Sequence, residues 1–134
     1  MQSPLRVWAL AVVVLAGMSA VVVAHHSPAV FDRTREVKLV GTVKAFKWQN
    51  PHTWLELDVP NDKGGVVTWG VEMTSPTYLI RAGWKNNSVK PGDNVTVVVN
   101  PVRTGEPAGI FISITLVDGR TLYEKPARLG GLSK

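Results

Sequence analysis

Three histidines are the side chains of this sequence best suited to chemistry: His25, His26 and His52. If the chain is cut after Ala24, His25 becomes the first residue, and its α-amine and its own imidazole can chelate one metal ion together. A second imidazole, from His26 or His52, would complete a T-shaped set of three nitrogen ligands, which suits Cu(II) better than Mg²⁺ or Ca²⁺. The spacing therefore predicts a candidate copper site. The alternative is that the two neighbouring histidines form a polar, flexible start to the mature chain and that His52 caps a turn.

Two carboxylates could support His52. Alternation along residues 52–59 and 66–73 places Glu56 and Glu72 on the outward face of two strands. From that face either one could hydrogen-bond to the His52 ring or act with it as a general base. Glu72 is the better candidate because it lies near the end of its strand. The alternative is a solvated strand face, where such side chains are usually found.

Aromatic side chains suggest a ligand surface. The chain has five tryptophans, which is many for 134 residues. Alternation assigns Trp48, Trp54 and Phe46 to the outward face, where they could stack on a small ligand or meet a partner protein. The alternative is that the N-terminal arm or a partner covers them. Basic residues number 15 against 10 acidic ones, and the net charge of +5 is spread along the chain. We therefore expect no nucleic-acid partner.

Several classes of function are excluded. The chain has no cysteine, which rules out disulfides, thiolate metal sites and cysteine catalysis. The motifs G-x-S-x-G and H-E-x-x-H and a glycine-rich phosphate loop do not occur. No nucleophile–base set is visible, so an enzyme is the least favoured class. The preferred class is a non-catalytic binding or accessory protein for a small ligand or an envelope protein. A periplasmic copper-binding protein is the alternative.

Residues 1–24 have the three-part pattern of a secretory signal peptide, with one arginine, an apolar run and small residues in that order. Val22 and Ala24 suit the −3 and −1 pockets of signal peptidase, which places the cut between Ala24 and His25. This predicts a periplasmic or secreted protein. The alternative is an uncleaved membrane anchor, because the apolar stretch is barely long enough to span a bilayer.

Period-two alternation predicts strands over residues 36–48, 52–59, 66–73, 94–100 and 110–117, and a short one over 120–123. Ser75 and Pro76 suit the start of a short helix after the third strand. The order β-β-β-α-β-β is typical of an OB-fold-like, five-stranded antiparallel barrel. The alternative is an open sandwich or another small barrel.

The same pattern divides the chain and assigns its core. We expect a signal peptide over residues 1–24, an extended arm over 25–35, a barrel domain over 36–124 and a flexible tail over 125–134. The predicted core residues are Val37, Leu39, Val43, Leu55, Leu57, Val67, Trp69, Val71, Leu79, Val95, Val97, Val99, Phe111 and Ile114.

Several separated motifs, in this order, resemble a family of small exported bacterial proteins that is a domain of unknown function. They are His25-His26-Ser27 with Phe31-Asp32, Asn50-Pro51-His52, Trp54, Trp69-x-x-Glu72-Met73-x-Ser75-Pro76, Gly83-Trp84 and Lys90-Pro91-Gly92-Asp93. Pro28 departs from the pattern, which has an aromatic residue after His-His-Ser. The resemblance implies an exported location and a small β-rich fold, and it implies no activity. It joins the histidine arm to His52 and Glu72, as one shared site or one shared packing unit.

Overall fold

Alternating apolar residues between turn signals produce the strands of this chain. The computed structural model describes residues 28–124. Its elements are η1 (Pro28–Val30), β1 (Val37–Lys47), β2 (Trp54–Pro60), β3 (Val66–Glu72), α2 (Pro76–Arg81), β4 (Asn94–Pro101), β5 (Ala108–Thr115) and β6 (Thr121–Tyr123). The predicted signal peptide, His25, His26 and the predicted tail lie outside the described residues. Within residues 28–124, none of the helices has the length and apolar character needed to cross a membrane.

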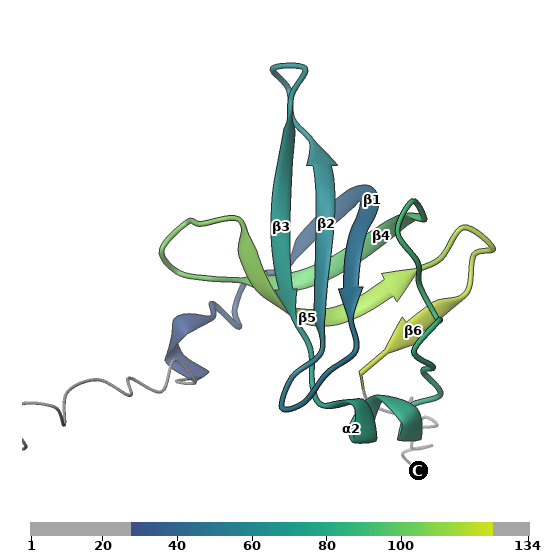
Figure 1. The fold of residues 1–134 in the computed structure, drawn as a ribbon. Helices are drawn as coiled ribbons and strands as arrows, with labels where there is room; N and C mark the ends of the chain where they lie inside the picture. Colours follow the sequence, from purple (N-terminus) through teal and green to yellow (C-terminus); the bar gives the residue numbers. More distant parts are fainter. Residues whose placement is uncertain (1–27, 125–134) are drawn as a thin grey trace, which may run out of the picture.

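The strands close into a barrel with the predicted OB-fold-like order. Hydrogen bonds connect them in the order β3-β2-β1-β4-β5-β6, and β3 also pairs with β5, which closes a barrel of β1 to β5. The closing pair is parallel and the other pairings are antiparallel. The helix α2 lies at one end of the barrel, and the β2–β3 hairpin projects at the other end (Figure 1). The predicted fold class is therefore confirmed, and the parallel closure is the feature that alternation alone does not reveal.

Inward-facing side chains of the barrel strands and α2 form one core. The predicted core residues that are buried are Leu39, Val43, Leu55, Leu57, Val71, Leu79, Val95, Val97, Val99, Phe111 and Ile114. Val37 and Trp69 are partly buried against this core, and Val67 is also partly buried. Met73, which follows β3, and Trp84 and Val89, which follow α2, also belong to the core.

A β-bulge in β1 reverses the face of the residues that follow it. The register of β1 against β2 shifts between Val43 and Ala45. Because side chains alternate with a period of two, a one-residue shift turns every later side chain to the other face. Phe46 and Trp48 therefore pack against the core, with ring centroids 5.7 Å apart. The prediction that they lie outward with Trp54 is wrong. It assumes strict alternation along the whole strand, and no residue type in the sequence indicates that a bulge interrupts it.

A second register shift explains the spacing of the inward residues on β5. The shift lies between Val98 and Val99 on β4. Val97 pairs with Ile114 and Val99 pairs with Phe111. Both β5 residues therefore face the core, although strict alternation would place them on opposite faces of the strand. Their predicted burial is confirmed.

Gly109 allows β5 to lie directly against β4. A methyl group at this position would lie 2.8 Å from the carbonyl oxygen of Asn100 and 2.9 Å from a methyl carbon of Val99. Gly109→Ala should therefore lower the free energy of unfolding, measured by urea denaturation, by about 1–3 kcal/mol. The control is Gly70→Ala, because a methyl group on Gly70 would meet nothing within 4 Å. It should change the free energy by about 0.5 kcal/mol or less, and equal losses in the two variants would contradict the close approach.

Candidate functional site

His52 and Glu72 form a hydrogen-bonded pair. His52 lies just before β2 and Glu72 is the last residue of β3, and these ends of the two strands face the side of the barrel where α2 lies (Figure 1). Nδ1 of His52 contacts Oε1 of Glu72. The His52 side chain is 34% exposed and the Glu72 side chain is 13% exposed. A carboxylate on one ring nitrogen sets the tautomer and orientation of an imidazole. The structure thus brings together two residues that the sequence singled out, and it leaves the imidazole partly accessible to solvent.

Backbone pairing around Thr53 places the His52 side chain. The strand β2 begins at Trp54 and not at the predicted His52, but its ladder continues backwards by one residue. The N–H of Thr53 donates to the carbonyl of Thr74 at 3.1 Å, and the N–H of Met73 donates to the carbonyl of Thr53 at 2.9 Å. Thr53 is fully buried, so alternation directs the preceding side chain to the outward face with Trp54.

The two predicted carboxylate partners of His52 have different contacts. Glu72 contacts His52, whereas Glu56 contacts Lys47. Farther along the same outward face, the Thr68 hydroxyl donates to a carboxylate, that of Asp58, at 2.6 Å. The face is therefore a series of local polar pairs, and Glu72 is the carboxylate that orients the histidine.

Trp54 is the one predicted ligand-surface ring on the outward face. In the register of the sheet it lies between Lys47 on β1 and Glu72 on β3, and it is half-buried. The ring of Phe46 lies on the core side, with its centroid 6.1 Å from that of Trp84. Of the three predicted rings, the Trp54 indole is therefore the one on the outward face, where Lys47 and Glu72 flank it.

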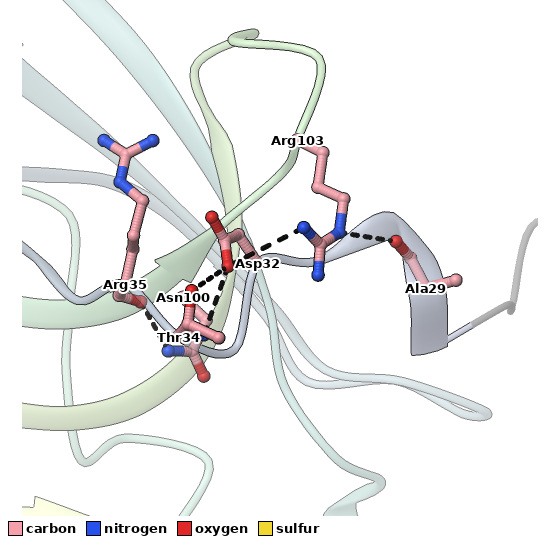
Figure 2. Close-up of polar contacts among 6 residues, drawn as sticks. All are labelled: Ala29, Asp32, Thr34, Arg35, Asn100 and Arg103. Carbon is pink, nitrogen blue, oxygen red and sulfur yellow. Dashed lines mark hydrogen bonds and ion pairs between the residues drawn. The ribbon is translucent and has the colours of Figure 1, made fainter.

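The described part of the predicted arm runs beside the end of β4 (Figure 2). Phe31 forms an antiparallel bridge with Val102. The N–H of Asp32 donates to the carbonyl of Pro101 at 2.8 Å. Residues 28–35 therefore comprise the short helix η1, a single bridge at Phe31 and a turn, and they are attached to the barrel. The predicted extended chain is wrong for this part of the arm.

Two residues that sequence analysis missed hold this arm in place. The side-chain amide of Asn100 donates to the carbonyl of Arg35 at 2.7 Å, and Asn100 is 9% exposed. Arg103 contacts the arm from the β4–β5 loop. A polar residue directly after the apolar run of residues 97–99 could have drawn attention to Asn100. Arg103 has no such signal, because it lies in a loop rich in proline and glycine.

The Asp32 carboxylate stabilises a turn in the arm. The Thr34 hydroxyl, 2.6 Å away, is the main cause that lowers the pKa of the Asp32 carboxyl below its ordinary value of 3.8, followed by the Thr34 N–H and the charges of Arg103 and Arg35. A carboxyl with a lowered pKa contributes stability fully above its unfolded value, and that contribution is lost as the pH falls through the folded value. These contacts of the Asp32 carboxylate therefore weaken as the solution becomes acidic.

The donor set for a metal is incomplete within the described residues. Residues 28–124 contain no group of three His, Cys, Asp or Glu side chains that could hold a metal ion. His52 and Glu72 supply one imidazole and the carboxylate that orients it. A site with three nitrogen ligands would therefore need His25 or His26, which lie outside the described residues.

A family model identifies the chain. The family is described as “Family of unknown function (DUF6152)”, and its model matches residues 11–111. The chain belongs to this family. The match confirms the resemblance to a domain of unknown function.

Other comparisons add little beyond the family. A comparison with curated proteins finds no match. Among solved structures, the chain is similar to the mitochondrial single-stranded DNA binding protein Rim1 from S. cerevisiae. The TM-score is 0.48 and the sequence identity is 14%, over 62% of this chain and 93% of that chain. The assignment of the barrel rests on the strand order and on the closing β3–β5 pair.

Proposed function

We propose that this DUF6152 member is a small exported, non-catalytic binding protein, and that its ligand is Cu(II). The observation that carries the proposal is the contact between Nδ1 of His52 and Oε1 of Glu72. Histidines that bind metals almost always donate their other ring N–H to a carboxylate, a backbone carbonyl or water. In that arrangement the metal is bound through Nε2.

The chemistry of the donors favours copper. The α-amine and imidazole of His25 would supply two nitrogen ligands, and His52 would supply the third, with His26 as the alternative. Among first-row divalent ions, Cu²⁺ binds such ligands most tightly, whereas Mg²⁺ and Ca²⁺ prefer oxygen. In this proposal the arm supplies the nitrogen ligands that join His52 at the metal.

The register of the barrel relates the arm to Glu72. Glu72 pairs with Ile110 on β5, and Ile110 pairs with Asn100 on β4, whose side chain donates to the carbonyl of Arg35 in the arm. Neighbouring strands are about 4.8 Å apart, so three spacings put about 15 Å between Glu72 and this part of the arm. The arm therefore borders the same sheet as Glu72, which supports the proposal.

The second candidate is a small polar ligand that stacks on Trp54. The observation that favours it is the position of this indole between Lys47 and Glu72 on the outward face. Stacking on an indole needs no histidine. A ligand of this kind should therefore bind His52→Ala as well as it binds the wild type, which separates this candidate from the copper site.

Export is tested by the intact mass of the protein recovered from the cell envelope. We expect the mass of a chain that begins at His25, because Val22 and Ala24 suit the pockets of signal peptidase. A chain that retains Met1, or that begins at any other residue, would contradict the proposed cleavage. It would also remove the amino-terminal chelate on which the copper site depends.

A further inference from the structure

We propose that a recess on the outer surface of β1, β4 and the end of β5 binds a small neutral molecule with an apolar body and a hydrogen-bonding group. The recess has a volume of about 460 Å³, and ligand pockets typically measure about 300–1,000 Å³. His52, Glu72 and Trp54 do not line it. The proposal is therefore independent of the copper site and of the Trp54 surface.

The register of the sheet brings the residues of this recess together. Val40 on β1 pairs with Thr96 on β4, and Thr96 pairs with Thr115 on β5. These three strands are neighbours in the sheet (Figure 1). Leu39 and Val97, which adjoin this row, are buried in the core. Alternation therefore directs the row of Val40, Thr96 and Thr115 to the outward face.

The described residues that line the recess include no charged side chain, although the sequence has 15 basic and 10 acidic residues. An ion that entered the recess would lose water without gaining a partner of opposite charge, which is unfavourable. An adjoining recess, which shares Val117 with this one, is lined by two basic and two acidic residues, so it favours neither sign of charge. The lining therefore selects a neutral molecule.

Two exposed valines supply apolar walls. Val40 is 61% exposed and Val117 is 78% exposed, and both line the recess. A ligand in contact with them would remove their methyl groups from water, which is favourable in proportion to the area covered. Single exposed apolar side chains are common on protein surfaces, whereas two at one recess suit an apolar ligand.

Polar groups beside these valines can bond the ligand. The Thr42 hydroxyl donates to Oδ1 of Asn94 at 2.9 Å. Among residues 28–124, neither the Nδ2 amide of Asn94 nor the hydroxyl of Thr96 has a hydrogen-bond partner. Both residues line the recess. An amide donor and a hydroxyl next to apolar walls suit a ligand that carries a hydroxyl or carbonyl group.

The test is a titration of the protein recovered from the cell envelope with 1-hexanol, hexanoate and hexylammonium, which share one apolar chain and differ in charge. Proton–nitrogen correlation spectra follow the backbone amides. We expect 1-hexanol to shift the signals of Val40, Thr96 and Val117, and both ions to bind at least about fivefold more weakly. No shift with 1-hexanol, or equal affinity for the three probes, would overturn the proposal.

Val40→Asp and Val66→Asp are matched variants for this titration. Both valines lie on strands and are 61% exposed, but Val66 does not line the recess. The carboxylate introduced by Val40→Asp should weaken binding of 1-hexanol by at least about tenfold, whereas Val66→Asp should bind it as the wild type does. Equal affinities in the two variants would contradict the site. If Val40→Asp does not fold, Val117→Asp introduces the same charge after the end of β5, and wild-type affinity in that variant would also contradict it.

Discussion

Replacing His52 with alanine should weaken Cu(II) binding by the mature chain by at least about 100-fold. The variant removes a proposed nitrogen ligand together with the ring that Glu72 orients. Loss of an orienting carboxylate alone typically costs about 10–100-fold in metal affinity, so Glu72→Gln should fall in that range. Competition titration against glycine near neutral pH measures both affinities.

Glu56→Gln is the matched control for this series. Glu56 lies on the same outward face, but it contacts Lys47, and its replacement makes the same change in charge as Glu72→Gln. We expect Glu56→Gln to bind Cu(II) as the wild type does. Equal losses of Cu(II) affinity in Glu56→Gln and Glu72→Gln would mean that net charge governs the affinity. Unchanged binding by His52→Ala would remove His52 from the site.

Replacing Trp84 with alanine should lower the free energy of unfolding by about 3–5 kcal/mol, the cost expected for truncating a buried tryptophan. Trp84 is 2% exposed, and its ring packs edge-on against Phe111 with centroids 5.5 Å apart. Its indole N–H also donates to the carbonyl of Tyr123 at 2.8 Å. The variant therefore opens a cavity and removes the indole N–H from the Tyr123 carbonyl. Urea denaturation measures the loss.

Two further variants keep this prediction testable if Trp84→Ala does not fold. Trp84→Phe retains an aromatic ring and removes the hydrogen bond to Tyr123, so it should lose less than half as much stability. Trp48→Ala truncates a tryptophan that is only partly buried against the core, and its loss should also be smaller. Equal losses of unfolding free energy in Trp48→Ala and Trp84→Ala would contradict the deeper burial of Trp84 in the core.

Most of the barrel could be predicted because burial and local sequence agree in its strands. Leu55 and Leu57 alternate with polar residues and are fully buried, as a half-buried strand requires. The bulge after Val43 could not be predicted, because the register is set by pairing with another strand, β2, and not by the residues of β1 alone. That one shift is why Phe46 faces the core. The parallel β3–β5 pair was not predictable for a similar reason, since it joins residues far apart in the chain.

The candidate site likewise has residues that the sequence could predict and one that it could not. His52 and Glu72 were recognisable because both are functional residue types on the same predicted face, and the structure brings their side chains into contact. Arg103 was not recognisable, because one of its partners is the backbone carbonyl of Ala29. Every residue type offers that carbonyl, so no pattern in the arm indicates that an arginine binds there.

The most direct test of the copper site compares the mature chain with a chain that has one alanine added before His25. Electron paramagnetic resonance of the Cu(II) complexes, together with calorimetric titration, reports the nitrogen ligands and the affinity. We predict that the mature chain binds one Cu(II) through three nitrogens, and that the added alanine weakens binding because the α-amine no longer chelates with the neighbouring imidazole. Equal binding by both chains, or no binding by either at micromolar concentration, would contradict the proposed site.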